Sequence, residues 1–212
     1  MRTRFDEQRE MLNRDMITMG MLCESAIKKT NEALLKNDLK LVESITELQD
    51  PIARKEREIE SLALQLILKQ QPVASDLRVV SSALKIVTDM QRIGDQSVDI
   101  AEIIRLGNTK NLQEDLNFEG MSDAVTKMVS GSIDAFVKND AKLAQTVVEY
   151  DDVVDEHFNR IKQRLVELLQ SGIVDAEALI DLLMIAKYYE RIGDHAVNIA
   201  NWVLYSITGE IQ

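Results

Sequence analysis

Apolar residues recur every three or four positions along almost the whole chain, which is the spacing of helices that bury one face. The first such stripe predicts a helix over residues 6–36, which ends at Asn37 and Asp38. The next stripe predicts a helix over residues 39–70. Pro51 lies within it and should kink or interrupt it just before that position, because proline lacks a backbone N–H. The first third of the chain is therefore predicted to be one long helix followed by a broken one.

Four further helices complete the predicted fold. A third helix follows the turn at residues 70–72 and runs to about residue 107, and the next three span residues 118–138, 140–170 and 175–208. No segment shows the strict alternation of apolar and polar residues that marks a strand. Six long helices joined by short loops predict an all-α protein of two antiparallel three-helix bundles.

Two sequence blocks occur twice, in the same order. The frame Arg-Ile-Gly-Asp-x-x-Val-x-Ile-Ala begins at Arg92 and again at Arg191, 99 residues later. The block Lys-Asn-Asp-x-Lys-Leu begins at Lys36 and again at Lys138, 102 residues later. Such an offset means that the chain is a duplicated unit. The expected domains are residues 1–108 and 118–212, joined by a polar connection at residues 109–117.

Composition narrows the classes of function. The 212-residue chain has a formal net charge of -11. This charge argues against nucleic-acid binding, which needs a basic face, and favours cations or a basic surface on a partner protein. The single cysteine, Cys23, cannot form an internal disulfide and suits a reducing compartment. The N-terminal residues lack the apolar core of a signal peptide, and no apolar run approaches the ~18 residues of a membrane span. We expect a soluble, cytoplasmic protein.

The second repeated frame carries oxygen-bearing side chains at helical spacing. At ~100° per residue, Glu190 and Asp194 lie in one row, which Asn198 extends. This row lies about a third to half a turn from the apolar stripe of its helix. Asp151 and Asp155 form another acidic pair on the preceding helix. Antiparallel packing of the two helices would bring the pairs together.

Clustered carboxylates of this kind allow two interpretations from spacing alone. They repel one another, and a bound multivalent cation removes that repulsion. The alternative is a solvated acidic face, with Arg191 pairing to Asp194 one turn away. His195 follows Asp194 directly and could add a nitrogen ligand. Helix geometry, however, turns its side chain about 100° away from the row of oxygen ligands. Both interpretations stay open.

The first copy keeps only part of this acidic set. Asp95 alone stands at a position equivalent to one of the four carboxylates, and Asp99 replaces Asn198. The other equivalent positions carry uncharged residues: Gln49, Ala53 and Gln91. Metal binding that needs the full set would therefore be confined to the second copy. Asp95 and Asp99 would form a weaker site or would simply be solvated.

Each frame also places a glycine in mid-helix, at Gly94 and Gly193. Glycine costs about 1 kcal/mol relative to alanine in that setting. Its presence at equivalent positions in both copies predicts the close approach of a facing helix.

The sequence offers no catalytic motif. The only histidines, His157 and His195, belong to no Glu-x-x-His pair of the kind that di-iron bundles use. There is no glycine-rich phosphate loop, Cys/His cluster or nucleophile elbow. We expect a protein that is not an enzyme.

Three segments together resemble the PhoU family of phosphate-transport regulators, over nearly the whole chain. They are Gln-Pro-Val-Ala-Ser-Asp-Leu-Arg at residues 71–78, Ile-Val-Thr-Asp-Met-Gln-Arg-Ile-Gly-Asp at residues 86–95, and Glu-Arg-Ile-Gly-Asp-His-Ala-Val-Asn-Ile-Ala at residues 190–200. The resemblance implies two three-helix bundles related by a pseudo-two-fold axis. This agrees with the fold predicted from the periodicity.

The resemblance also implies a metal-binding role for the acidic residues. Members of the family bind metal ions, in some cases as multinuclear clusters, through (Glu/Asp)-x-x-x-Asp motifs. The matching residues here are Asp151 with Asp155 and Glu190 with Asp194, and in the first copy Asp95 matches. The ions implied are divalent or trivalent, with iron or zinc expected before manganese or magnesium.

The function that the resemblance implies is negative regulation of phosphate uptake and of phosphate-starvation signalling. A similar protein would be an adaptor between the nucleotide-binding subunit of a phosphate ABC transporter and a sensor histidine kinase. It would be a homodimer, would bind no nucleic acid, and would reach the membrane only through its partners. Two alternatives remain: a carboxylate-bridged metalloenzyme of ferritin-like type, and a metal-free scaffold whose acidic face meets a basic partner.

Overall fold

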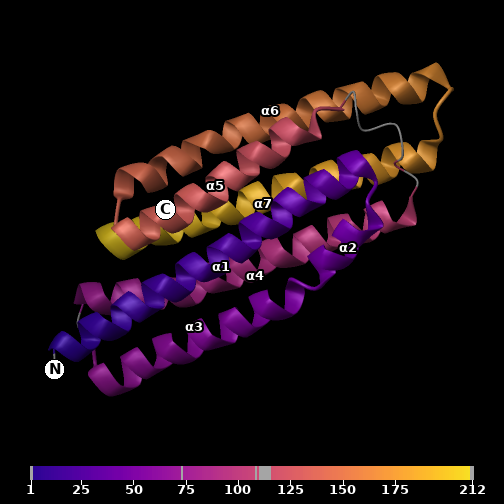
Figure 1. The fold of residues 1–212 in the computed structure, drawn as a ribbon. Coiled ribbons are helices and arrows are strands. Elements are labelled where there is room, and N and C mark those ends of the chain that lie inside the picture. Colours follow the sequence, from indigo (N-terminus) through magenta and orange to yellow (C-terminus); the bar gives the residue numbers. More distant parts are fainter. Residues whose placement is uncertain (1, 73, 108, 110–115, 211–212) are drawn as a thin grey trace.

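The computed structural model describes residues 2–72, 74–107, 109 and 116–210, and within them the chain forms seven α-helices (Figure 1). The helices are α1 (Arg2–Lys36), α2 (Leu39–Thr46), α3 (Gln49–Gln70), α4 (Ala74–Leu106), α5 (Phe118–Lys138), α6 (Ala141–Ser171) and α7 (Ala176–Thr208). The all-α prediction is confirmed, with α2 and α3 as the two parts of the predicted broken helix. The domain boundaries stay a prediction, since residues 110–115 of the connection lie outside the described residues.

The predicted break near Pro51 lies between α2 and α3. Helix α2 ends at Thr46 and α3 begins at Gln49, so Pro51 lies in the first turn of α3. Proline is tolerated there because the first N–H groups of a helix have no partner within it. The chain resumes helical bonding at once, as the Ile52 N–H donates to the Leu48 carbonyl over 3.1 Å. Proline therefore separates a short helix from the long helix α3 that packs against α4.

The repeated Lys-Asn-Asp block ends one helix and begins the next in both copies. Asn37 and Asn139 have φ angles of +51° and +53°, a left-handed conformation that asparagine tolerates better than most residues. Asp38 and Asp140 then cap the following helices. Each accepts a hydrogen bond from the backbone N–H two residues on, at 2.9 and 3.0 Å. The same local chemistry thus forms equivalent corners in the two halves.

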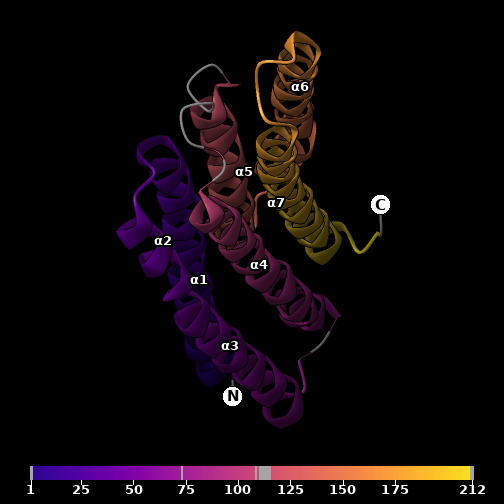
Figure 2. The same cartoon turned by 90° about the vertical axis from the view of Figure 1, so that its right-hand side faces the viewer.

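The helices pack as two three-helix bundles. In the first bundle α1, α3 and α4 contact one another, and in the second α5, α6 and α7 do so. Between the bundles α4 packs against α7 and α1 against α5, which are the helices at equivalent positions in the two copies. Figure 2 shows α3 and α6 on opposite outer sides, with α4 and α7 between them. The predicted pair of bundles with a pseudo-two-fold relation is confirmed.

A continuous apolar core joins the two bundles. Tyr189 of α7 is fully buried, with its ring centroid 6.4 Å from that of Phe118. Its hydroxyl lies 2.8 Å from Thr30 Oγ1 of α1, so one buried hydrogen bond links the bundles. Among the helices described, none has a segment long and apolar enough to cross a membrane.

Candidate metal site

The acidic pairs of the second copy lie on the two helices of one hairpin. Gly172, just after α6, has a φ of +66°, which glycine adopts without strain. Asp175 then caps α7 by accepting a hydrogen bond from the Glu177 N–H at 3.2 Å. Helices α6 and α7 pack against each other along this antiparallel return. The turn chemistry therefore brings residues 151–155 of α6 beside residues 190–194 of α7.

The two helices of the hairpin come close at Gly193. A Cβ added there would lie 3.4 Å from Val154 Cγ1 and 3.5 Å from Asp151 Oδ1. The equivalent Gly94 faces Ile52, whose Cδ1 would lie 2.8 Å from such a Cβ. Ile52 and Val154 are 102 positions apart, the offset of the repeated Lys-Asn-Asp block, so both halves pack in the same register. The predicted close approach is confirmed at both glycines and is tighter at Gly94.

Asp151 is the centre of the acidic cluster, a name we use for Asp151, Asp155, Glu190 and Asp194. The pKa of the Asp151 carboxyl is raised to about 6, first by burial and then by the negative charges of Asp155, Asp194 and Glu190. Charges act on a carboxyl in this way only from nearby, so Asp155, Glu190 and Asp194 all lie within electrostatic reach of Asp151. Asp151 and Glu190 are half-buried, whereas Asp155 and Asp194 are exposed.

Lys187, a residue that the sequence analysis missed, lies at the edge of the acidic cluster. It forms an ion pair with Glu190 one turn along α7. Its ammonium also lies 5.6 Å from the centroid of the Phe158 ring on α6. The i,i+3 spacing of Lys187 and Glu190 is a sequence signal that could have found this pair. The basic partner on α7 is thus Lys187, and the alternative pairing of Arg191 with Asp194 is not among the ion pairs of the described residues.

The donors of the acidic cluster suit a cation, although they are not arranged around one. In the part of the chain that the structure describes, no three Asp, Glu, His or Cys side chains are grouped so as to hold a metal ion. Four carboxylates nevertheless offer the oxygen ligands that hard and borderline cations take. Burial, and after it the charges of the three neighbouring carboxylates, disfavours the ionised form of Asp151. Glu190 would have to turn away from Lys187 to share a cation with Asp151.

His195 and Asn198 contact the other bundle instead of the acidic cluster. His195 Nδ1 lies 2.9 Å from Asp89 Oδ1 of α4. Asn198 Nδ2 donates to the same oxygen over 3.4 Å. Asn198 therefore does not extend the row of oxygen ligands, and His195 supplies no nitrogen to it. The duplication did not point to Asp89, because it lies outside the repeated frame and its equivalent in the second copy is Tyr188.

The first copy has a smaller acidic group, and one member stands at an unpredicted position. Asp95 forms an ion pair with Arg92 at 3.4 Å. Glu56 of α3 lies near it, since the pKa of Glu56 is raised by burial, then by Glu60, and also by the charge of Asp95. With its amide oriented to donate, the Gln91 nitrogen lies 2.9 Å from Glu56 Oε1. Glu56 was missed because it lies one turn beyond Ala53, the position that the repeat aligns with Asp155.

Asp99, the other candidate in the first copy, lies within electrostatic reach of the second bundle. Its pKa is raised by burial and by the charge of Asp95, and the Arg191 guanidinium of α7 acts in the opposite direction. Asp95 and Asp99 thus lie near each other, with an arginine near each. The described residues of the first copy thus also place carboxylates near one another, Glu56, Asp95 and Asp99, but at other positions than the second copy does.

The fold and site define a class of protein: a duplicated all-α protein with carboxylates gathered on the helical hairpin of its second half. The family model described as PhoU domain matches residues 16–104 and again residues 118–203. This chain belongs to the PhoU family.

Relatives match it over nearly the full length. The phosphate-specific transport system accessory protein PhoU homolog of Clostridium acetobutylicum is 36% identical over 208 residues, covering 97% of this chain and 95% of the relative. The homolog of the same name from Aquifex aeolicus is 35% identical over 203 residues, covering 95% and 92%. The crystal structure of PhoU from Pseudomonas aeruginosa superposes with a TM-score of 0.88 at 30% identity, covering 97% of this chain and 100% of that one.

Proposed function

We propose that this protein is a negative regulator of phosphate uptake and of phosphate-starvation signalling. The observation that carries the proposal is the full-length match to relatives named as accessory proteins of phosphate-specific transport. PhoU is a family of accessory and regulatory proteins rather than of enzymes. In this role the protein is cytoplasmic, forms a homodimer, and links the nucleotide-binding subunit of the phosphate ABC transporter to a sensor histidine kinase.

An exposed apolar surface at the α6–α7 turn supports a role that depends on protein partners. Ile173 is 87% exposed, Ile180 60%, Leu169 54% and Val166 47%. Val166, Leu169 and Ile180 line a groove of about 190 Å³ between the two helices. Neighbouring apolar side chains left in water are typical of protein-binding surfaces.

The acidic cluster is the metal site that we propose for this regulator. Support comes from the raised pKa of Asp151, which burial causes first and the charges of Asp155, Asp194 and Glu190 increase, because a bound cation would favour the ionised carboxylates. Asp151 and Asp155 would hold the ion from α6, and Glu190 and Asp194 from α7. The ion would supply positive charge that joins the two helices of the hairpin.

The regulatory role is tested by deleting the gene and measuring a phosphate-starvation reporter in high phosphate. We expect the reporter to be expressed constitutively, and the wild-type gene on a plasmid to restore repression. Normal repression in the deletion strain would refute the proposed role.

The metal site is tested by measuring the metal content of untagged protein by mass spectrometry. The double variant D151N/E190Q should lose bound metal. The matched control D152N/E149Q removes two exposed carboxylates from the same region of α6 and should keep it. Metal retained by D151N/E190Q would contradict the assignment and would favour Asp95 and Asp99 as the ligands.

A metal-free scaffold is the second candidate, and the ion pair between Lys187 and Glu190 favours it. In that case the acidic face binds a basic partner surface directly. Partner binding that salt weakens and a chelator leaves unchanged would support the scaffold over the metal-dependent adaptor.

A further inference from the structure

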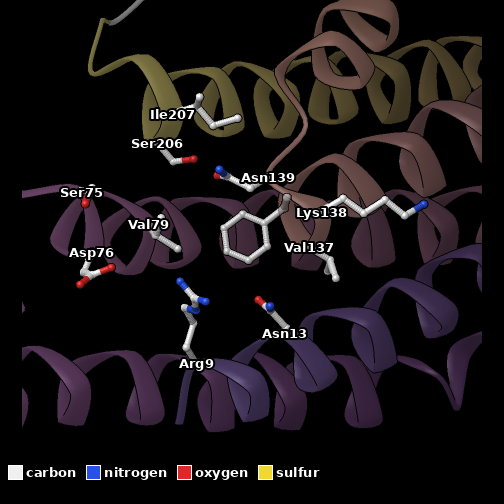
Figure 3. Close-up of a pocket in the computed structure, with 11 residues that line it drawn as sticks. Arg9, Asn13, Ser75, Asp76, Val79, Val137, Lys138, Asn139, Ser206 and Ile207 are labelled. Atoms are coloured by element: carbon white, nitrogen blue, oxygen red, sulfur yellow. The ribbon is translucent and has the colours of Figure 1, made fainter. Parts of the chain in front are cut away.

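A cavity of about 430 Å³ lies between the two bundles, where α5 and α7 end and α4 begins (Figure 3). Its lining includes Arg9, Asn13 and Asp76 from the first bundle and Phe136, Asn139 and Ile207 from the second. No residue of α6 lines it, so it is separate from the acidic cluster. Each half of the molecule thus contributes part of the lining of one cavity that is open to solvent.

Four of the polar side chains that line this cavity are available to a bound molecule. In the described part of the chain, Arg9, Asn13, Asp76 and Asn139 form no side-chain hydrogen bond or ion pair. Figure 3 shows Arg9 and Asn13 extending into the cavity from one side and Asn139 from the other. Lys138 at the rim differs from them, because an ion pair within α5 holds its ammonium. A guanidinium, a carboxylate and two amides are therefore available to a bound molecule.

These groups define the chemistry of the ligand. Arginine presents a planar set of donors that matches a phosphate group. A carboxylate such as Asp76 accepts hydrogen bonds from sugar hydroxyls, as acidic residues do for ribose in dinucleotide-binding folds. Val79, Val137 and Ile207, which are partly exposed, add apolar surface for a ring. The N-terminus of the 33-residue helix α4 at the same end also favours an anion.

We propose that this cavity binds a phosphorylated nucleoside of the size of a nucleoside monophosphate. The phosphate contacts Arg9, the ribose hydroxyls contact Asp76, and the base lies against Ile207 near the amide of Asn139. The cavity volume falls within the range of roughly 300–1,000 Å³ that small-molecule sites occupy. Inorganic phosphate would leave the apolar part unfilled, and a cation would meet the charge of Arg9.

Because both bundles contact such a ligand, its binding would stabilise their contact as well as the fold. This inference does not rest on the proposed regulatory function or on the acidic cluster. If this protein proved to have no role in phosphate signalling, we would still expect the cavity to bind the ligand.

The test is isothermal titration calorimetry with AMP, ribose 5-phosphate, adenosine and inorganic phosphate as separate probes. We expect AMP to bind most tightly, followed by ribose 5-phosphate. R9Q should weaken AMP binding by about 10- to 100-fold, the loss expected when a charged hydrogen bond is removed. D76N should weaken the binding of the two ribose-containing phosphates. The matched control R14Q changes an exposed arginine five residues along α1 that does not line the cavity, and it should bind AMP as the wild type does.

Thermal unfolding with and without AMP provides a second measurement. AMP should raise the melting temperature of the wild type and of R14Q, and should raise that of R9Q much less. Three results would overturn the proposal: no heat of binding from AMP, binding by R9Q as tight as by the wild type, or preferential binding of inorganic phosphate. Circular dichroism of each variant checks that it is folded.

Discussion

Replacing Asp151 by asparagine should stabilise the metal-free protein. Burial and the neighbouring carboxylates raise the pKa of Asp151 from 3.8 to about 6, so its ionised form lowers the stability of the fold at neutral pH. The full difference corresponds to about 3 kcal/mol. Because Asp151 is only half-buried, solvent screening reduces this to about 1 kcal/mol. We therefore expect D151N to raise the free energy of unfolding at neutral pH by about 1 kcal/mol.

The same effect predicts a dependence on pH with a definite sign. The folded carboxyl holds its proton more tightly than the unfolded one, so the destabilisation is absent below the ordinary pKa of 3.8. It grows as the pH rises toward the folded pKa of about 6 and is complete above it. Through this group the stability of the metal-free wild type falls across that range. The difference in stability between D151N and the wild type should appear over the same range.

The assay is urea unfolding followed by circular dichroism, in the presence of a chelator. D152N is the matched control, because Asp152 is the exposed neighbour of Asp151 and contributes least to its pKa. Added metal should reverse the order by stabilising the wild type more than D151N, which lacks a ligand. A D151N variant less stable than the wild type in chelator, beside an unchanged D152N, would refute the reasoning. The carboxylate would then be favourable to the fold without a cation.

Three further predictions concern the fold, and urea unfolding measures each of them. G193A should raise the free energy of unfolding by up to about 1 kcal/mol, since the new Cβ fits in ordinary contact. G94A should raise it less, because the side chain of Ile52 must move to make room. Equal increases for the two variants would contradict the difference in packing. Y189F should cost about 1 kcal/mol by removing the hydrogen bond with Thr30, and an unchanged stability would mean that this bond contributes nothing. D140A should lower the free energy of unfolding by about 1 kcal/mol, because α6 loses its N-terminal cap. The control D123A changes an exposed aspartate and should leave the stability unchanged. A D140A variant as stable as D123A would contradict the capping role.

Helix ends and the placement of the acidic pairs were predictable because they depend on local chemistry. Asn37 ends one helix through its left-handed backbone, and Asp38 begins the next by accepting a hydrogen bond from the Lys40 N–H. Pro51 affects only the first turn of α3, in which it lies. Asp155, Glu190 and Asp194 come within electrostatic reach of Asp151 because two i,i+4 pairs lie on the arms of one short-looped hairpin. Neither inference needs knowledge of how the two bundles pack against each other.

The contacts between bundles were not predictable in the same way. His195 and Asn198 meet Asp89 across α4 and α7, and that pairing depends on the crossing of two helices about one hundred residues apart in the chain. Periodicity indicates which face of a helix is apolar, but it does not state which residue of another helix lies opposite. Glu56 was missed for a related reason, because a carboxylate one turn from the aligned position can still reach the same place.

Helix α7 carries both the acidic cluster and the contact with the first bundle. Glu190 and Asp194 face α6, and the residue after each, Arg191 and His195, is turned about 100° toward α4. If the cluster takes up a cation as proposed, the ion acts on the turns of α7 that hold the bundles together. We expect metal to change amide hydrogen exchange in α4 as well as in α6 and α7. If α7 is rigid, a change at its face toward α6 also moves its face toward α4. Exchange altered in α6 and α7 alone would therefore mean that the metal site and the contact between the bundles are independent.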